Sequence, residues 1–163
     1  MGITIAANNW RYGPKMNGDI DQELLAVVRA AAAYLPKGWE LVFVSGYRKG
    51  DKRFHGKHMA LDIQLIDNNG RPLPNYQDDL AFRAYESFAQ SVRKAQLKLY
   101  PKMPLRWGGY FSGARGKYGA LDLMHFDVAG NHAPMGGGSF DLGLTQAQRK
   151  LWPRAVSEGM SKV

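Results

Sequence analysis

Residues 58–66 read HMALDIQLI, and their polarity alternates from one position to the next. Successive side chains of a β-strand point to opposite faces, so the apolar residues at positions 59, 61, 63 and 65 predict a strand with one buried face. The opposite face carries Ala60, Asp62 and Gln64, and the turn sequence DNNG at 67–70 ends the strand. Aspartate is disfavoured within strands. Asp62 is therefore either an ordinary solvent-facing residue or part of a functional site.

The segments around this strand predict an α+β domain. They are a helix from Asp19 or Asp21 to Leu35, a strand over 39–47, a long helix from Asn75 or Asp78 to Tyr100, a strand-like segment over 121–128 and a last helix from Thr145. Helix formers fill the first helix, and Pro36 and Gly38 close it. The long helix has an apolar stripe whose members step by four and three residues. Helices and strands of mixed order, with at least one antiparallel hairpin, are typical of the α+β class.

The length and composition are those of one globular domain. The chain has 163 residues, which we expect to form a single domain over residues 1–163. Apolar residues make up 45% and charged residues 22%, which excludes a wholly disordered chain or a coiled coil. Cysteine is absent, so thiol nucleophiles, disulfide scaffolds and cysteine-based zinc sites are excluded.

The chain is strongly basic, with 22 Lys and Arg against 14 Asp and Glu and a formal net charge of +8. A basic surface favours polyanions such as nucleic acid, anionic lipid or bacterial cell wall. The basic residues form two loose clusters, near 49–57 and 93–102, and no nucleic-acid-binding motif accompanies them. We therefore interpret the charge as a solvated basic surface and expect no nucleic-acid partner.

Nothing in the sequence predicts a membrane span, because no apolar run approaches 18 residues. The N-terminal sequence MGITIAANNW has no basic region and only a very short apolar run, so it does not resemble a secretory signal peptide. We expect the chain to be synthesised in the cytoplasm without a signal peptide.

A metal site is the functional alternative for Asp62. His55 precedes it by seven residues, in the loop FHGKH over 54–58, and such a loop can fold an imidazole back beside a carboxylate that projects from the strand. Nitrogen and oxygen ligands of this kind suit zinc. A zinc enzyme needs a third protein ligand and an open position for water. The remaining histidines are His58, His125 and His132.

His125 lies in the second strand-like segment, where a lone histidine is more often a hydrogen-bonded core residue than a ligand. Asp122 precedes it by three residues, however, and a zinc-bound water requires a nearby carboxylate to take its proton. Positions 122 and 125 of a regular strand would point to opposite faces. The hypothesis therefore needs a turn at Asp122, which the neighbouring Gly119-Ala120 makes credible.

Short motifs in chain order give the sequence a family resemblance. The motifs are SGYR at 45–48, His55 with Ala60 and Asp62 in register, WGG at 107–109 and DLMHF at 122–126. Together they cover roughly residues 39–128, and the chain resembles the zinc peptidases of bacterial cell walls. These are the D-alanyl-D-alanine carboxypeptidases and dipeptidases and the phage L-alanyl-D-glutamate endopeptidases. Two positions depart from the family pattern, because Arg53 replaces a serine and His58 replaces a glycine. His58 thus offers a competing imidazole.

The resemblance implies roles for individual residues. His55, Asp62 and His125 would bind Zn²⁺, and Asp122 would act as the general base. Arg48 would lie near the site and hold the substrate carbonyl oxygen or the developing oxyanion, unless it forms a salt bridge that braces the loop. Trp107 and its two glycines would either shape the cleft wall or pack beside a tight turn. The implied fold is hedgehog/DD-peptidase-like, with a small antiparallel sheet and helices packed on it.

The implied function is hydrolysis of a peptide bond in peptidoglycan by a monomeric zinc metallopeptidase. The missing signal peptide, the short chain and the WGG motif look most like a phage endolysin-type enzyme that cuts between L-alanine and D-glutamate. Such an enzyme would be phage- or prophage-encoded and would reach the cell wall through a holin or within the virion. The alternatives are a D-alanyl-D-alanine carboxypeptidase or dipeptidase, and a non-catalytic zinc-containing module that binds cell wall.

Overall fold

The computed structural model describes residues 9–16, 18–50, 56, 58–75, 79–111, 122–129 and 137–140. Its elements are β1 (Trp10–Tyr12), α1 (Gln22–Ala32), β2 (Glu40–Ser45), β3 (Ala60–Ile66), α2 (Asp79–Leu99), β4 (Arg106–Phe111), β5 (His125–Asp127) and β6 (Gly137–Ser139). Within these ranges, neither helix is long and apolar enough to cross a membrane.

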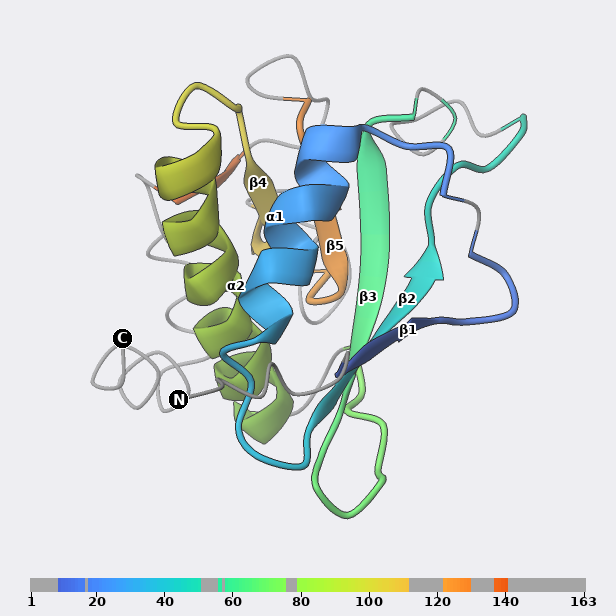
Figure 1. The fold of residues 1–163 in the computed structure, drawn as a ribbon, viewed down its shortest axis with the longest axis vertical. Helices are drawn as coiled ribbons and strands as arrows, with labels where there is room; N and C mark the ends of the chain where they lie inside the picture. The colour runs from blue at the N-terminus through green and yellow to red at the C-terminus, as the bar shows by residue number, and fades with distance from the viewer. Residues whose placement is uncertain are drawn as a thin grey trace, which may run out of the picture.

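The strands form one six-stranded sheet in the order β1-β2-β3-β5-β4-β6 (Figure 1). All neighbouring pairs are antiparallel except β1 with β2 at one edge. This mixed edge departs from the antiparallel sheet that we expected. Its cause is the helix α1 between the two strands, since a chain that crosses over a helix re-enters the sheet in the same direction.

Both helices lie on one side of the sheet (Figure 1) and share a single apolar core with it. The predicted alternation of β3 is confirmed. Leu61, Ile63 and Leu65 are fully buried in this core, whereas Asp62 and Gln64 are only partly buried. Phe126 of β5 is also fully buried in the core. The polar side chains of β3 and β5 therefore lie on the sheet face that points away from the helices.

The other predicted elements form with shifted ends. Asp21 caps α1, because its carboxylate accepts a hydrogen bond of 2.9 Å from the backbone N–H of Leu24. The helix ends at Ala32, since residues 33–35 leave it in a turn. The last predicted helix, from Thr145, lies outside the described residues.

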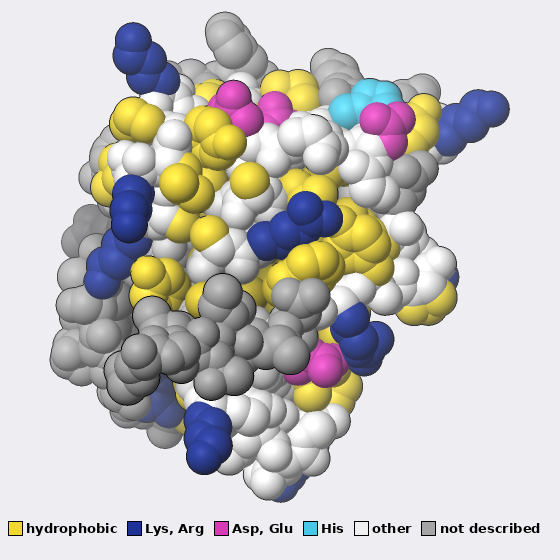
Figure 2. All heavy atoms as spheres, viewed as in Figure 1, with side chains coloured by type: hydrophobic (Ala, Val, Ile, Leu, Met, Phe, Trp, Pro, Cys, Tyr) yellow, Lys and Arg dark blue, Asp and Glu magenta, His cyan; other side chains and the backbone are white. Residues whose placement is uncertain are grey.

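Lys and Arg side chains are spread over the face shown in Figure 2, singly or in small groups, with apolar and uncharged side chains between them. They do not join into one continuous stripe on this face. The distribution agrees with our interpretation of a solvated basic surface.

Candidate active site

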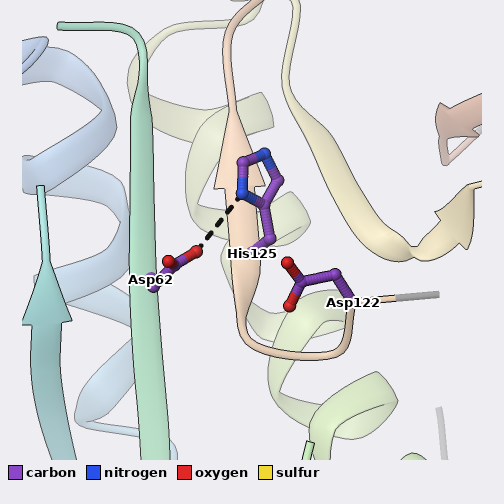
Figure 3. Close-up of side chains that lie close together, drawn as sticks. All are labelled: Asp62, Asp122 and His125. Atoms are coloured by element: carbon purple, nitrogen blue, oxygen red, sulfur yellow. Dashed lines mark hydrogen bonds and ion pairs between the residues drawn. The ribbon is translucent and has the colours of Figure 1, made fainter. Parts of the chain in front are cut away.

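Strand pairing brings Asp62 and His125 together, although they lie 63 positions apart in the chain. The antiparallel register of β3 and β5 places the two residues directly opposite each other, where side chains share one face of the sheet. The distance from Oδ1 of Asp62 to Nδ1 of His125 is 3.2 Å (Figure 3). Two of the predicted ligands are therefore in contact.

A turn before β5 brings in Asp122, as the hypothesis required. Residues 123 and 124 form this turn, and the backbone N–H of His125 donates a hydrogen bond of 3.2 Å to the carbonyl oxygen of Asp122. Figure 3 shows the carboxylate of Asp122 beside the imidazole of His125. One ligand atom from each of Asp62, Asp122 and His125 lies within 4.8 Å of the others, which makes these residues a candidate metal-binding group.

Of the remaining histidines, only His58 lies within the described residues. His55 and His132 lie outside the described residues, so the predicted third ligand is not placed here. The ring of His58 stacks on that of Tyr47 at 4.0 Å between centroids, and its Nδ1 lies 2.6 Å from the carbonyl oxygen of Asp19. His58 is thus engaged beside the start of α1 and does not belong to the candidate group.

Arg48 and Ser45 contact the second oxygen of Asp62. Nη2 of Arg48 lies 2.9 Å from Oδ2 of Asp62, and the hydroxyl of Ser45 donates to the same atom at 3.1 Å. Arg48 is 47% exposed, so its guanidinium lies between the site and solvent. The salt bridge that we considered for Arg48 is present, and it lies at the solvent edge of the site. The contact of Ser45 was missed, although the β2–β3 register pairs it with Asp62.

Asn75 holds the carboxylate of Asp122. Its side-chain N–H donates a hydrogen bond of 3.0 Å to Oδ1 of Asp122, and its own oxygen accepts one of 3.2 Å from the backbone N–H of Met124. Burial raises the pKa of Asp122, and the nearby charge of Asp62 raises it further against the lowering effects of His125 and Asn75. A carboxylate with a raised pKa is a better proton acceptor near neutral pH.

The WGG motif packs against the same turn. Trp107 is fully buried, and its indole N–H donates a hydrogen bond of 2.8 Å to the carbonyl oxygen of Leu123. A Cβ atom on Gly108 would lie 2.0 Å from the carbonyl oxygen of Asp122, so only glycine permits this close approach. The structure thus favours a packed tryptophan beside a tight turn over a tryptophan in the cleft wall.

A buried carboxylate that we did not predict contacts the other ring nitrogen of His125. Nε2 of His125 lies 2.8 Å from Oδ2 of Asp127, which is itself paired with Arg106. Burial lowers the pKa of His125, but its hydrogen bonds to Asp127 and Asp62 outweigh burial and raise the pKa to about 10 when no metal is bound. Burial would raise the pKa of Asp127, whereas the hydrogen bonds from His125 and Arg106 hold it below its usual value.

Asp62 and His125 are spaced as two ligands of a zinc ion would be. Zinc accepts imidazole nitrogen and carboxylate oxygen at about 2.0–2.2 Å, so two ligands of one tetrahedral ion lie about 3.4 Å apart. The observed spacing of 3.2 Å between Asp62 and His125 agrees with this value. Nε2 of His125 is already hydrogen-bonded to Asp127, which leaves Nδ1 for a metal.

The fold has a solved counterpart among peptidases. The chain is similar to the crystal structure of the L-Ala D-Glu endopeptidase ChiX from Serratia marcescens, with a TM-score of 0.51 and 17% sequence identity over 68% of this chain and 81% of that chain. At this identity the likeness establishes a shared fold, and the predicted α+β fold class is confirmed. No protein-family model matches the chain, and no curated protein matches it.

Proposed function

We propose that this protein is a zinc-dependent peptidase that hydrolyses a peptide bond in the stem peptides of bacterial peptidoglycan. The observation that carries the proposal is the convergence of Asp62, His125 and Asp122. One ligand atom of each residue lies within 4.8 Å of the other two. The shared fold with a solved L-Ala D-Glu endopeptidase supports the same reaction class. We infer further that the bond is the one between L-alanine and D-glutamate and that the protein acts as a monomeric endolysin-type enzyme.

Each residue of the site has a role in this proposal. Asp62 and His125 would hold the zinc ion together with His55, the ligand that the family resemblance implies. When bound, zinc supplies Lewis-acid activation of the attacking water and of the scissile carbonyl group. The other steps fall to the side chains of this chain.

Asp122 moves the proton. Its carboxylate takes a proton from the attacking water and delivers it to the nitrogen of the leaving amine, which a side chain with a raised pKa does well. Asn75 keeps the carboxylate in place through its bond to Oδ1. Arg48, at the solvent edge of the site, would hold the carbonyl oxygen of the substrate while negative charge develops on it.

The test is hydrolysis of defined muropeptides, with the products weighed by mass spectrometry. Turnover that a chelator abolishes and added zinc restores is expected. Release of fragments cut between L-alanine and D-glutamate would support the endopeptidase assignment, whereas release of D-alanine would assign the enzyme to the D-alanyl-D-alanine carboxypeptidases. Binding of the cell wall without any turnover would contradict the proposal and identify a non-catalytic module.

Asp122→Asn separates chemistry from metal binding. We expect this variant to fold and keep zinc but to lose activity by about 10²–10⁴-fold, because an amide cannot accept the proton of water. Glu23→Gln, a change of the same kind at an exposed position of α1, is the matched control and should keep full activity. Turnover near that of the wild type in a folded Asp122→Asn protein would remove Asp122 from the mechanism.

A further inference from the structure

A buried ion pair lies directly behind the candidate metal site. Asp127 is fully buried and Arg106 is 3% exposed, and the β4–β5 register pairs the two residues. The guanidinium binds the carboxylate in a fork, with Nε to Oδ1 and Nη2 to Oδ2 both at 2.8 Å. Buried ion pairs are expensive to desolvate and are often no more stabilising than apolar residues of the same volume. Stability alone therefore does not explain this pair.

The hydrogen bonds of Asp127 determine the protonation of its neighbour. Its two oxygens accept four hydrogen bonds, two from Arg106, one from Nε2 of His125 at 2.8 Å and one from the backbone N–H of Ala129 at 3.1 Å. An ionised carboxylate only accepts hydrogen bonds, so Nε2 of His125 must carry a proton. In a neutral imidazole the lone pair is then on Nδ1, the atom that lies 3.2 Å from Asp62.

The backbone sets this arrangement. Asp127 follows His125 by two residues in β5, so both side chains lie on one face of the sheet, and Phe126 between them points into the core. The ring of Phe111 adds an apolar contact, because the Arg106 guanidinium carbon lies 4.7 Å from its centroid and the His125 ring lies 5.5 Å from it. Nε2 of the imidazole is therefore bonded to a buried carboxylate that hydrogen bonds from Arg106 and Ala129 hold in place.

We propose that Asp127, clamped by Arg106, is a positioning residue that fixes the tautomer and ring orientation of His125, so that Nδ1 presents its lone pair to the metal. This inference rests on the proposed zinc site. Carboxylates that bond the outer nitrogen of a ligating histidine typically change metal affinity by about 10–100-fold when they are removed. Asp127 does not touch the substrate, so its effect passes through His125.

The experiment measures zinc affinity and ring protonation in Asp127→Asn. The dissociation constant for zinc, determined by competition with a chromophoric chelator, should rise by about 10–100-fold. Long-range ¹H–¹⁵N spectra of the zinc-loaded protein should show Nε2–H and a metal-bound Nδ1 for His125 in the wild type. In the variant, this pattern should be replaced by mixed or inverted tautomers. An unchanged dissociation constant and an unchanged ring pattern would overturn the proposal.

Two further variants keep the test decisive. Arg106→Gln combined with Asp127→Asn removes both buried charges together, so neither is left unpaired if the single variant does not fold. The double variant should show the same loss of affinity. Val28→Ala would leave a cavity where α1 packs on the core, so it should lower the free energy of unfolding without touching the site. Its zinc affinity should be unchanged. If the wild type bound no zinc, both the proposed function and this inference would fail. If Val28→Ala weakened zinc binding as much as Asp127→Asn does, only the inference would be overturned.

Discussion

Replacing Gly108 with alanine would place a Cβ atom 2.0 Å from the carbonyl oxygen of Asp122 and 2.9 Å from its carbonyl carbon. Carbon and carbonyl oxygen normally approach no closer than about 3.3 Å, so the backbone of Asp122 must retreat by roughly 1.3 Å. The obstacle is backbone rather than the end of a flexible side chain. The hydrogen bond of 3.0 Å from the Asp122 N–H to the Gly108 carbonyl couples the two segments further.

This displacement acts on the proposed general base. A misplacement of about 1 Å can reduce the rate by about 10²-fold, so we expect the kcat of Gly108→Ala to fall by that order. Overpacking should also lower the free energy of unfolding by about 1–3 kcal/mol. Asp62 and His125 are held by the β3–β5 register, so zinc should remain bound.

The assay is hydrolysis of a defined muropeptide by zinc-loaded protein, with zinc content and thermal unfolding measured on the same sample. Gly18→Ala is the matched control, because a Cβ there meets nothing within 4 Å. Activity within a few-fold of the wild type in a folded Gly108→Ala protein would refute the argument that the glycine positions Asp122.

The other predictions concern metal binding, pH and salt. Elemental analysis should show that His55→Ala and His125→Ala each lose zinc. His58→Ala should keep zinc, because that ring contacts Tyr47 and Asp19. Metal loss in His58→Ala would instead make His58 a ligand. In the metal-free protein the pKa of His125 is raised from 6.5 to about 10, so its stabilising contribution is complete below pH 6.5 and is lost as pH rises through 10. Denaturant unfolding should show this loss in the wild type but not in His125→Gln, and zinc affinity should rise over the same interval because zinc displaces the proton. Hydrolysis of intact sacculi should slow as salt shortens the Debye length from about 10 Å at 0.1 M to about 3 Å at 1 M, while hydrolysis of a small muropeptide should change little. Equal salt responses of the two substrates would mean that the net charge of +8 does not serve attraction to the cell wall.

The parts of the fold that the sequence predicted are those with a strong local pattern. The alternation over 59–65 places Asp62 opposite the core, and the helix formers after Asp21 produce α1. Strand β1 was missed because three residues carry no period, and its parallel pairing depends on the crossover through α1. Helix and strand ends shifted by a few residues where turns replaced the last predicted positions.

The candidate site likewise has a part that the sequence predicted and a part that it did not. The contact of Asp62 with His125 follows from motif order and a family resemblance, and the turn at Asp122 was required by the geometry of a strand. From the sequence, Asp127 could be recognised only as a polar residue in a predicted strand. Its partner Arg106 comes from β4, and which strands pair is decided by the whole sheet. No local pattern could have joined the two.

The order of the strands also bears on how the site is assembled. β3 and β5 are neighbours in the sheet, yet α2 and β4 lie between them in the chain, so Asp62 and His125 meet only when the chain closes the loop that contains this intervening segment. Contacts of such long sequence separation form slowly because a large loop must close first. A backbone cut between α2 and β4 would leave Asp62 on one fragment and His125 on the other. Each fragment would carry only half of the proposed site, His55 and Asp62 on one and Asp122 and His125 on the other, so tight metal binding would report the reassociation of the two fragments.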